Sequence, residues 1–359
     1  MKQNQFYILS GENPTIPSAE CLAILESYNI SYKAEKYEQV LILNSEEESC
    51  QLIAERAAMV HRCCILLAKC EANMKRIMDS VREINFQKYI SNRESFAVRI
   101  KHISNYSSEL SSTFLEREIG NIIHKNVEAK VNLGNPDKLF YGVLTENMFI
   151  FGKNVRRSER KTLSLRKAKF RPFFIPSSMN PSLARAMVNL SRARPREIFY
   201  DPFCGAGGIL IEAGLVGCRL IGSDIDIKMV KGTEKNLKHY KLKDWSIVQS
   251  DAKHLPINKA NSIATDPPYG GSASTKGKRP EKLIEDFLEE IANLSSSIGY
   301  LCIGVPLTMD LNENFKELGF QTIEKHFVRA HKSLTRQIIV LGKSSTRREV
   351  FKHKSFFTN

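Results

Sequence analysis

The chain has 359 residues, of which 42% are hydrophobic, and a formal net charge of +14 at pH 7. This length suggests two or three domains, and the apolar fraction is ordinary for a globular protein with a sizeable core. The sequence holds no apolar run of about 18 residues, so it predicts no transmembrane helix. Its first residues lack the apolar stretch of a signal peptide, and we expect a cytoplasmic protein.

The eight cysteines are scattered along the chain, and none forms a Cys-x-x-Cys pair. Cys63 and Cys64 are adjacent, which suits neither a disulfide between them nor the usual spacing of zinc ligands. We therefore expect reduced, mostly buried thiols and no metal site.

The positive charge is concentrated in one stretch. Residues 151–200 hold 13 Lys and Arg against 2 Asp and Glu, net +11. Residues 1–150 are net −2 (17 against 19), and residues 201–359 are net +5 (23 against 18). A solvated linker would explain part of this run. Its uniform positive charge nevertheless favours a polyanionic partner, and nucleic acid is the obvious one.

The N-terminal third is predicted to be α+β. Strands are expected at residues 5–10, 39–43 and 95–100, and a hairpin at 139–144 and 147–151. Helices are expected at residues 17–28, 49–58, 74–83 and 113–124, whereas residues 61–68 fit either state. No cofactor or metal motif occurs in this third of the chain.

Strands and helices alternate in the second half. Strands are expected from Ile198 and at residues 220–225, 245–249, 261–266 and 300–305. Helices are expected at 182–190, 206–216, 227–239, 281–296 and 312–318, followed by an antiparallel pair at 320–328 and 337–341. This alternation predicts a mainly parallel sheet.

The second half is organised around the glycine-rich turn Asp201-Pro-Phe-Cys-Gly-Ala-Gly-Gly208. Glycines let the backbone turn tightly and approach a ligand, and the free N–H groups of the following helix favour a hydrogen-bond acceptor. Asp224 ends the next strand, 19 residues after Gly205. An acid about 20 residues after such a turn is suited to contact a ribose. The pattern predicts a nucleoside-bearing cofactor.

Four acids, Asp201, Asp224, Asp251 and Asp266, follow successive strands. In an open α/β sheet the carboxyl ends of the strands form the ligand site, so the four acids together indicate one site. A dinucleotide site is disfavoured because Leu210 stands where the third glycine of the turn would be. An ATP-hydrolysing P-loop is disfavoured because the sequence has no Gly-x4-Gly-Lys-Ser/Thr motif.

Two motifs resemble those of a known family. The turn at 201–208 resembles motif I of the S-adenosylmethionine-dependent Rossmann-fold methyltransferases. Asp266-Pro-Pro-Tyr269 resembles the Asp/Asn-Pro-Pro-aromatic motif of their amino-methylating branch. The N-terminal third, with Phe6-Tyr-Ile-Leu-Ser10 and the 139–151 hairpin, resembles the ferredoxin-like leader and THUMP module of tRNA-modifying enzymes. The chain as a whole is similar to archaeal tRNA guanine N2-methyltransferases that act on guanosine 10.

The resemblance implies a Rossmann-fold methyltransferase sheet preceded by an α+β ferredoxin-like and THUMP RNA-binding region. The divisions it implies are 1–48 for the ferredoxin-like part, 49–152 for the THUMP domain, 153–171 for a basic linker, 172–345 for the methyltransferase domain and 346–359 for a basic tail. The implied reaction is methylation, once or twice, of the exocyclic N2 amine of guanosine 10 in tRNA. The enzyme would be a monomer that uses S-adenosyl-L-methionine and no metal, and its THUMP module would hold the 3′ end of the tRNA.

The resemblance also implies roles for individual residues. Asp266, Pro267 and Tyr269 would be catalytic, because the carboxylate and the proline carbonyl accept the amine N–H groups while the aromatic ring stacks on the base. Cofactor contacts are implied for Ser178, Asp201, Gly205, Gly207, Asp224, Asp251 and Ala252. The charge distribution adds the cations expected to contact RNA phosphates, which are Arg156, Arg157, Arg160, Lys161, Arg166 and Lys167.

Two departures from the family pattern are visible. Ala206 stands where many relatives have Thr, and Ile175-Pro-Ser-Ser-Met179 stands where a His-Pro-Gly-like opening is common. Neither removes a carboxylate. The alternatives are an amino-methyltransferase acting on rRNA guanine or DNA adenine, and a non-catalytic RNA-binding relative, against which the intact Asp-Pro-Pro-Tyr motif argues. A THUMP-bearing thiouridine synthetase is disfavoured because the Ser-Gly-Gly-x-Asp-Ser loop is absent.

Overall fold

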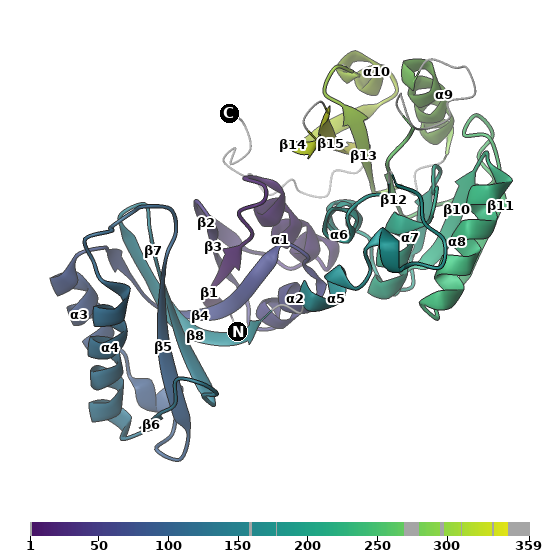
Figure 1. The fold of residues 1–359 in the computed structure, drawn as a ribbon. Helices are drawn as coiled ribbons and strands as arrows, with labels where there is room; N and C mark the ends of the chain where they lie inside the picture. The colour runs from purple at the N-terminus through teal and green to yellow at the C-terminus, as the bar shows by residue number, and fades with distance from the viewer. Residues whose placement is uncertain are drawn as a thin grey trace. The chain divides into compact units, whose positions relative to one another are not determined.

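The structure, a computed structural model, describes residues 2–157, 160–176, 178–268, 280–294, 298–309, 311–331 and 334–343. Contacts within the chain define two compact units (Figure 1). Unit 1 comprises Met1–Pro14, Ile30–Glu55 and Val60–Ser158, and unit 2 comprises Thr15–Asn29, Arg56–Met59 and Glu159–Asn359. Within the described ranges, no helix has the length and apolar character needed to cross a membrane.

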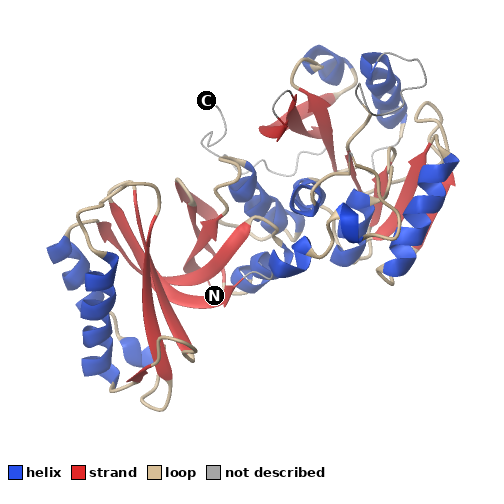
Figure 2. Cartoon of the chain, in the orientation of Figure 1, coloured by secondary structure: helices blue, strands red, loops and turns tan. Residues whose placement is uncertain are grey.

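Unit 1 is built on an eight-stranded sheet in the order β2-β3-β1-β4-β8-β7-β5-β6. Strands are red and helices blue in Figure 2. Its strands are β1 (Lys2–Leu9), β2 (Lys33–Tyr37), β3 (Val40–Glu46), β4 (Val60–Glu71), β5 (Ser95–His102), β6 (Lys130–Val131), β7 (Lys138–Thr145) and β8 (Met148–Arg157). Residues 61–68, which fit either state in the sequence, belong to β4. This long strand pairs antiparallel with both β1 and β8, so one continuous sheet joins the first strands to the 139–151 hairpin.

Unit 1 also contains three α-helices and one short 3₁₀ helix among its described residues. These are α2 (Ser49–Arg56), α3 (Met74–Arg82), α4 (Ser112–Val127) and η1 (Phe86–Lys88). Asn73 and Ser111 cap α3 and α4 by accepting backbone N–H groups of the first turn. Along α4 the buried residues recur at helical spacing, and they join the phenylalanines of β5, β7 and β8 in one apolar cluster.

Unit 2 contains a seven-stranded sheet in the order β11-β10-β9-β12-β13-β15-β14. Its strands are β9 (Ile198–Asp201), β10 (Arg219–Asp224), β11 (Trp245–Gln249), β12 (Ser262–Thr265), β13 (Tyr300–Pro306), β14 (Phe320–His331) and β15 (Leu334–Lys343). The strands from β9 to β13 are parallel, whereas β15 runs antiparallel to β13 and β14. The predicted mainly parallel sheet with a closing antiparallel hairpin is confirmed.

The helices of unit 2 are α1 (Ile16–Ser27), α5 (Arg160–Ser164), α6 (Pro181–Leu190), α7 (Gly208–Val216), α8 (Ile227–His239), α9 (Pro280–Asn293) and α10 (Asn312–Glu317), with the 3₁₀ helix η2 (Ala168–Phe170). Nearly all of α6 is buried because α1 and α7 both pack against it. Helix α1 therefore belongs by its contacts to unit 2, although its sequence lies between two strands of unit 1.

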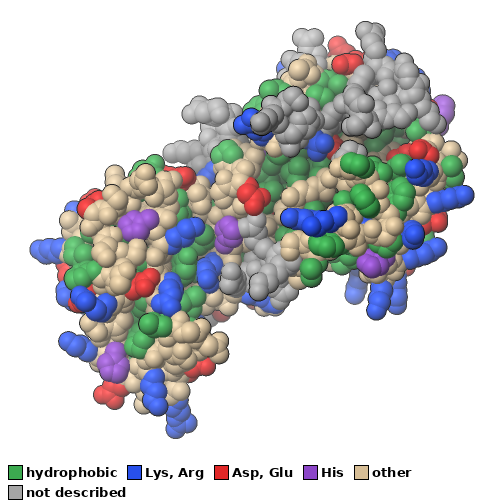
Figure 3. All heavy atoms as spheres, viewed as in Figure 1, with side chains coloured by type: hydrophobic (Ala, Val, Ile, Leu, Met, Phe, Trp, Pro, Cys, Tyr) green, Lys and Arg blue, Asp and Glu red, His purple; other side chains and the backbone are tan. Residues whose placement is uncertain are grey.

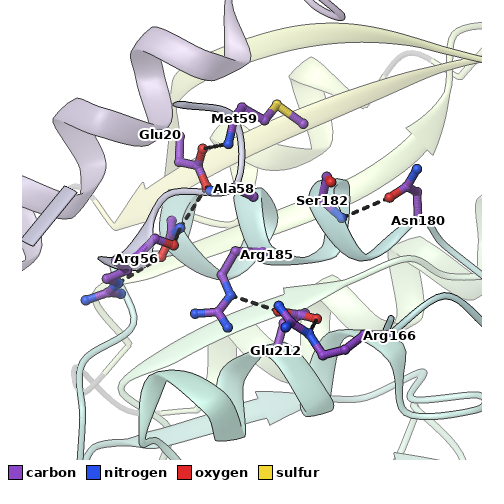
Figure 4. Close-up of polar contacts among 10 residues, drawn as sticks. Glu20, Arg56, Ala58, Met59, Arg166, Asn180, Ser182, Arg185 and Glu212 are labelled. Atoms are coloured by element: carbon purple, nitrogen blue, oxygen red, sulfur yellow. Dashed lines mark hydrogen bonds and ion pairs between the residues drawn. The ribbon is translucent and has the colours of Figure 1, made fainter. Parts of the chain in front are cut away.

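A buried carboxylate fastens α1 and residues 56–59 to α6 (Figure 4). Glu20 accepts the backbone N–H groups of Ala58 and Met59, each at 2.9 Å, and the side-chain amide of Asn189 at 2.8 Å. Arg56 donates from Nε to Asn189 Oδ1 at 2.8 Å. Burial raises the pKa of Glu20, and these donors oppose the rise. Segments far apart in the sequence thus share one satisfied polar network.

The basic stretch 153–171 contains parts of three elements that the structure describes. Strand β8 continues to Arg157 because β4 is long enough to pair with it up to Arg62, and α5 and η2 follow.

All eight cysteines are unbridged, and they are buried apart from the partly exposed Cys70, so the prediction of mostly buried thiols is confirmed. In the part of the chain that the structure describes, no group of three or more His, Cys, Asp or Glu residues is placed to hold a metal ion.

Candidate active site

The carboxyl ends of four adjacent strands carry the four acids identified in the sequence. Strands β11, β10, β9 and β12 are neighbours in that order, which places Asp251, Asp224, Asp201 and Asp266 along one edge. The backbone N–H of Ser250 donates to the carbonyl of Asp224 at 3.1 Å, so the ends of β10 and β11 are tied together. This is the edge at which an open α/β sheet binds its ligand.

The turn between β9 and α7 shapes the middle of this edge. Gly205 (φ +50°) and Gly207 (φ +76°) both have left-handed backbone conformations that favour glycine. A Cβ at Gly207 would lie 2.9 Å from Thr233 Cγ2, so this glycine lets α8 pack against the turn. At Gly205 a Cβ would meet no described atom within 4 Å apart from its chain neighbours. The turn is therefore open at Gly205, where a ligand could approach the backbone.

Asp224 is held in place by backbone donors from both sides. Gly205 N–H donates to Oδ2 at 3.0 Å, and Asp226 N–H donates to Oδ1 at 2.9 Å. Each carboxylate oxygen can accept more than one hydrogen bond, so Asp224 can also accept from the two hydroxyls of a ribose.

The end of β11 offers a second acceptor. Asp251 Oδ1 accepts the backbone N–H of Lys253 at 3.1 Å, which closes a turn around Ala252. The Ala252 side chain is buried in the apolar cluster beneath the turn. What this residue can offer a ligand is its backbone.

Asp201 differs from the prediction of direct cofactor contact, because it lies beneath the turn and is only 1% exposed. Its Oδ1 accepts Thr265 Oγ–H at 2.7 Å and the backbone N–H of Phe203 at 3.2 Å. Burial, helped by the charges of Asp224 and Asp266, raises the pKa of Asp201 to about 7. In this structure its carboxyl group links the β9 turn to the end of β12.

Ser178 precedes α6, whose N-cap is Asn180, and the Asn180 side chain accepts the backbone N–H of Ser182 at 2.9 Å (Figure 4). Ser178 Oγ is buried and has no hydrogen-bond partner among the described residues. A buried hydroxyl without a partner costs free energy that a ligand could recover.

Asp266 and Pro267 directly follow β12. The side chain of Asp266 is 18% exposed, and its Oδ2 lies 3.3 Å from Nη1 of Arg336 on β15. Arg336 carries no local signal in the sequence, because only the pairing of distant strands brings it to this edge. Tyr269 lies outside the described residues, so its role in stacking stays a prediction.

The cations expected to contact RNA fall into three groups. Arg156 on β8 is 42% exposed and forms a surface ion pair with Glu55 at 2.7 Å, and Lys167 is exposed. A surface pair of this kind contributes little stability, so it leaves the cation available to a phosphate. The side chains of Arg157, Arg160 and Lys161 lie outside the described part of the structure.

Arg166, which was also expected to contact RNA, is held by a buried carboxylate of the protein. Its guanidinium is only 13% exposed and donates from Nε and Nη2 to Glu212 at 2.7 and 2.9 Å. Arg185 Nε donates to the same carboxylate at 2.9 Å (Figure 4). Glu212 on α7 is fully buried, so its charge needs a cationic partner, and both arginines donate to it. Sequence position alone did not distinguish this buried cation from its exposed neighbours.

Two segments of the chain match known domain families. Residues 168–337 match the RMKL-like methyltransferase domain, and residues 71–151 match the THUMP domain. The fold of the chain is similar to that of TrmN from Thermus thermophilus, with a TM-score of 0.53 and 18% identity, over 95% of this chain and 99% of that one.

Two curated relatives align with almost the whole chain. The tRNA (guanine(10)-N2)-dimethyltransferase of Methanothermobacter thermautotrophicus is 38% identical over 93% of this chain and 98% of its own length. The protein of the same name from Methanocaldococcus jannaschii is 34% identical, over 94% and 99%. Identity at this level over both full lengths shows common family membership. The chain therefore belongs to the tRNA (guanine(10)-N2)-dimethyltransferase family.

Proposed function

We propose that this protein is an S-adenosyl-L-methionine-dependent methyltransferase that methylates the exocyclic N2 amine of guanosine 10 in tRNA. The first transfer gives N2-methylguanosine, and a second transfer gives N2,N2-dimethylguanosine. The observation that carries the proposal is the edge of four acids. Asp224 and Asp251 stand on one side of the glycine turn, and Asp266 stands on the other. A cofactor site and an amine-binding carboxylate are thereby next to each other in a chain of this family.

The residues at the turn fit the cofactor. The open backbone at Gly205 would hold the methionine end, Asp224 the ribose hydroxyls, and Asp251 with the Ala252 backbone the adenine. The buried Ser178 hydroxyl supplies a further polar contact. When bound, S-adenosyl-L-methionine supplies an electrophilic methyl group on a positively charged sulfur.

Asp266 addresses the chemical difficulty of the reaction. An exocyclic amine is a poor nucleophile because its lone pair is delocalised into the ring. Hydrogen bonds from the amine to the Asp266 carboxylate and the Pro267 carbonyl draw its nitrogen toward tetrahedral geometry, which frees the lone pair. The proline ring of Pro267 restricts the backbone and keeps these acceptors in place before the substrate arrives. The carboxylate also stabilises the positive charge that develops on the nitrogen.

In the second methylation, the amine has fewer N–H groups to donate to the same acceptors. A monomethylated amine has one N–H left, so it can engage either Asp266 or Pro267, but not both. Asp266 is the stronger acceptor because it carries a charge. We therefore propose that the second transfer depends more on this carboxylate than the first.

Binding of tRNA rests on phosphate contacts to exposed cations. In unit 1 these include Arg156, and in unit 2 they include Lys167 and the lysines of the basic helix α8. Lys and Arg side chains project from the surface around α8 in Figure 3. Such contacts position an RNA without reading its sequence, so selection of guanosine 10 rests on other features. We further propose that the enzyme acts as a monomer, in the cytoplasm where tRNA is found.

The proposal is tested by mapping methylation on three tRNA transcripts. One carries guanosine at position 10, one carries adenosine there, and one carries inosine, which differs from guanosine only in lacking the 2-amino group. With labelled cofactor, the guanosine transcript should yield N2-methylguanosine and then N2,N2-dimethylguanosine, and the other two should yield neither. Label in another nucleoside would contradict the assigned position. Label in an rRNA fragment or a DNA duplex, but not in tRNA, would favour the alternative amino-methyltransferases.

A further inference from the structure

The pairing of strands brings Arg336 to the end of β12. Asp266 follows Thr265, which lies opposite Ile303 on β13, and Arg336 on β15 lies opposite Pro306 at the end of β13. The guanidinium of Arg336 therefore reaches across β13, which lies between β12 and β15, to Asp266, where Nη1 lies 3.3 Å from Oδ2. Both side chains are largely shielded from solvent, at 15% and 18% exposed, so the pair is little screened by water.

Gly304 on β13 provides the space for this arrangement. A Cβ at this position would lie 2.7 Å from Asp266 Oδ1, closer than real Cβ atoms approach an oxygen. Gly304 is not among the residues with a positive φ, so its backbone conformation does not require glycine. The requirement is steric, because the observed orientation of the Asp266 carboxylate is incompatible with a side chain at residue 304.

We propose that Arg336 and Gly304 are positioning residues for methyl transfer, which together fix the orientation of the Asp266 carboxylate. Arg336 holds Oδ2, and Gly304 leaves room for Oδ1. This inference rests on the proposed role of Asp266 as the acceptor of the target amine. Neither residue needs to touch the substrate, since both act through Asp266.

The positive charge of Arg336 also offsets the electrostatic repulsion between the acids at this edge. The charges of Asp224 and Asp266 both raise the pKa of Asp201, so these acids lie close together. Carboxylates near one another disfavour each other's charged form. The guanidinium of Arg336 places a positive charge 3.3 Å from Oδ2 of Asp266 and so offsets this repulsion.

The test compares three variants with a matched control in the full-length protein. Arg336→Met removes the cation, Arg336→Lys keeps it without the planar fork, and Gly304→Ala places a methyl group against Oδ1. Arg329→Met removes an exposed arginine from the neighbouring strand β14 and serves as the control. Single-turnover methyl transfer is measured with saturating tRNA and cofactor. The Kd values for both are measured separately, and thermal unfolding checks that each variant is folded.

Arg336→Met and Gly304→Ala should slow single-turnover transfer by about 10²-fold, the scale of a misplaced reacting group, with both Kd values unchanged. Arg336→Lys should recover part of the rate, and Arg329→Met should match the wild type. A crystal structure of Gly304→Ala should show the Asp266 carboxylate displaced. A wild-type rate in Arg336→Met and Gly304→Ala, or a loss explained by weaker tRNA binding, would overturn the inference. If Arg336→Met does not fold, Arg336→Lys and Gly304→Ala still decide it.

A double variant separates this inference from the proposed function. If Arg336 acts through Asp266, then Arg336→Met should have little further effect in an Asp266→Ala background. A slow Asp266→Ala with additive losses in the double variant would overturn only the positioning role of Arg336. A wild-type rate in Asp266→Ala would overturn the proposed mechanism itself.

Discussion

Gly205 donates its backbone N–H to Oδ2 of Asp224 at 3.0 Å, and this hydrogen bond joins the glycine turn after β9 to the end of β10. Two parts of the proposed cofactor site are thereby fixed relative to each other without a ligand. A site organised in advance loses less conformational freedom when it binds, which improves affinity.

Replacement of Asp224 by Ala should weaken binding of S-adenosyl-L-methionine by roughly 1–3 kcal/mol, the cost of leaving buried hydroxyls without a partner. Isothermal titration calorimetry measures this directly. The matched control is Asp226→Ala, which removes an acid that caps α8 through Lys228 N–H and should leave cofactor affinity nearly unchanged. Equal affinity in Asp224→Ala and wild type would remove Asp224 from the cofactor site.

Neutralising Arg156, Arg157, Arg160 and Lys161 together should weaken tRNA binding. The log–log dependence of the binding constant on salt should become flatter by roughly 0.7–0.9 for each phosphate that these cations no longer neutralise. Cofactor affinity should stay the same. Filter binding at several salt concentrations gives the slope, and an unaltered slope would reduce this segment to a solvated connection.

Arg166 should behave differently from those four cations, because it balances the buried Glu212. Arg166→Met leaves the carboxylate with Arg185 alone. The variant loses charge-assisted hydrogen bonds to a buried carboxylate, each worth about 1.5–3 kcal/mol, so we expect a clear fall in the free energy of unfolding. Urea denaturation measures it. If stability were unchanged while the salt slope of tRNA binding fell, Arg166 would be an RNA contact after all.

The pKa of Asp201, raised to about 7 from an ordinary value of 3.8, makes stability depend on pH. Between about pH 4 and pH 7 the folded state keeps a proton that the unfolded chain has lost, so the free energy of unfolding should fall as pH rises through this range. The fall should be on the order of a few kcal/mol. Asp201→Asn, which keeps an acceptor for Thr265, should flatten this slope and unfold with a higher midpoint than wild type at pH 8. A slope equal to that of wild type would show that Asp201 does not titrate there.

The sequence was sufficient to predict the elements that are marked by local residue patterns, such as short strands and glycine-rich turns. Strand β10, which ends at Asp224, and strand β12, which Asp266 follows, are short, and the glycines at 205 and 207 stand where left-handed backbone needs them. Parallel strands place their carboxyl ends at one edge, so the order of the acids along the chain was enough to predict their gathering.

The remaining features depend on contacts between distant segments, which local patterns do not report. Arg336 reaches Asp266 only through the pairing of β15 with β13, and Gly304 shows no special backbone conformation that would mark it. Arg166 resembles its basic neighbours in sequence, and only the packing against α7 shows that Glu212 holds it. Helix α1 carries the buried Glu20, a sign of tertiary partners, but the sequence did not show that those partners lie on α6 and residues 56–59.

The central claim is that Asp266 acts on the chemical step, and a single-turnover assay on guanosine-10 tRNA tests it most directly. Asp266→Ala should lower the rate of methyl transfer by about 10²–10³-fold, the usual effect of losing one preorganised electrostatic group. Affinity for tRNA should stay nearly constant, because phosphate contacts dominate binding. Asp266→Asn keeps one acceptor oxygen without the charge, so it should retain partial activity. A wild-type rate in Asp266→Ala would contradict the mechanism and favour a protein that binds RNA without modifying it through this motif.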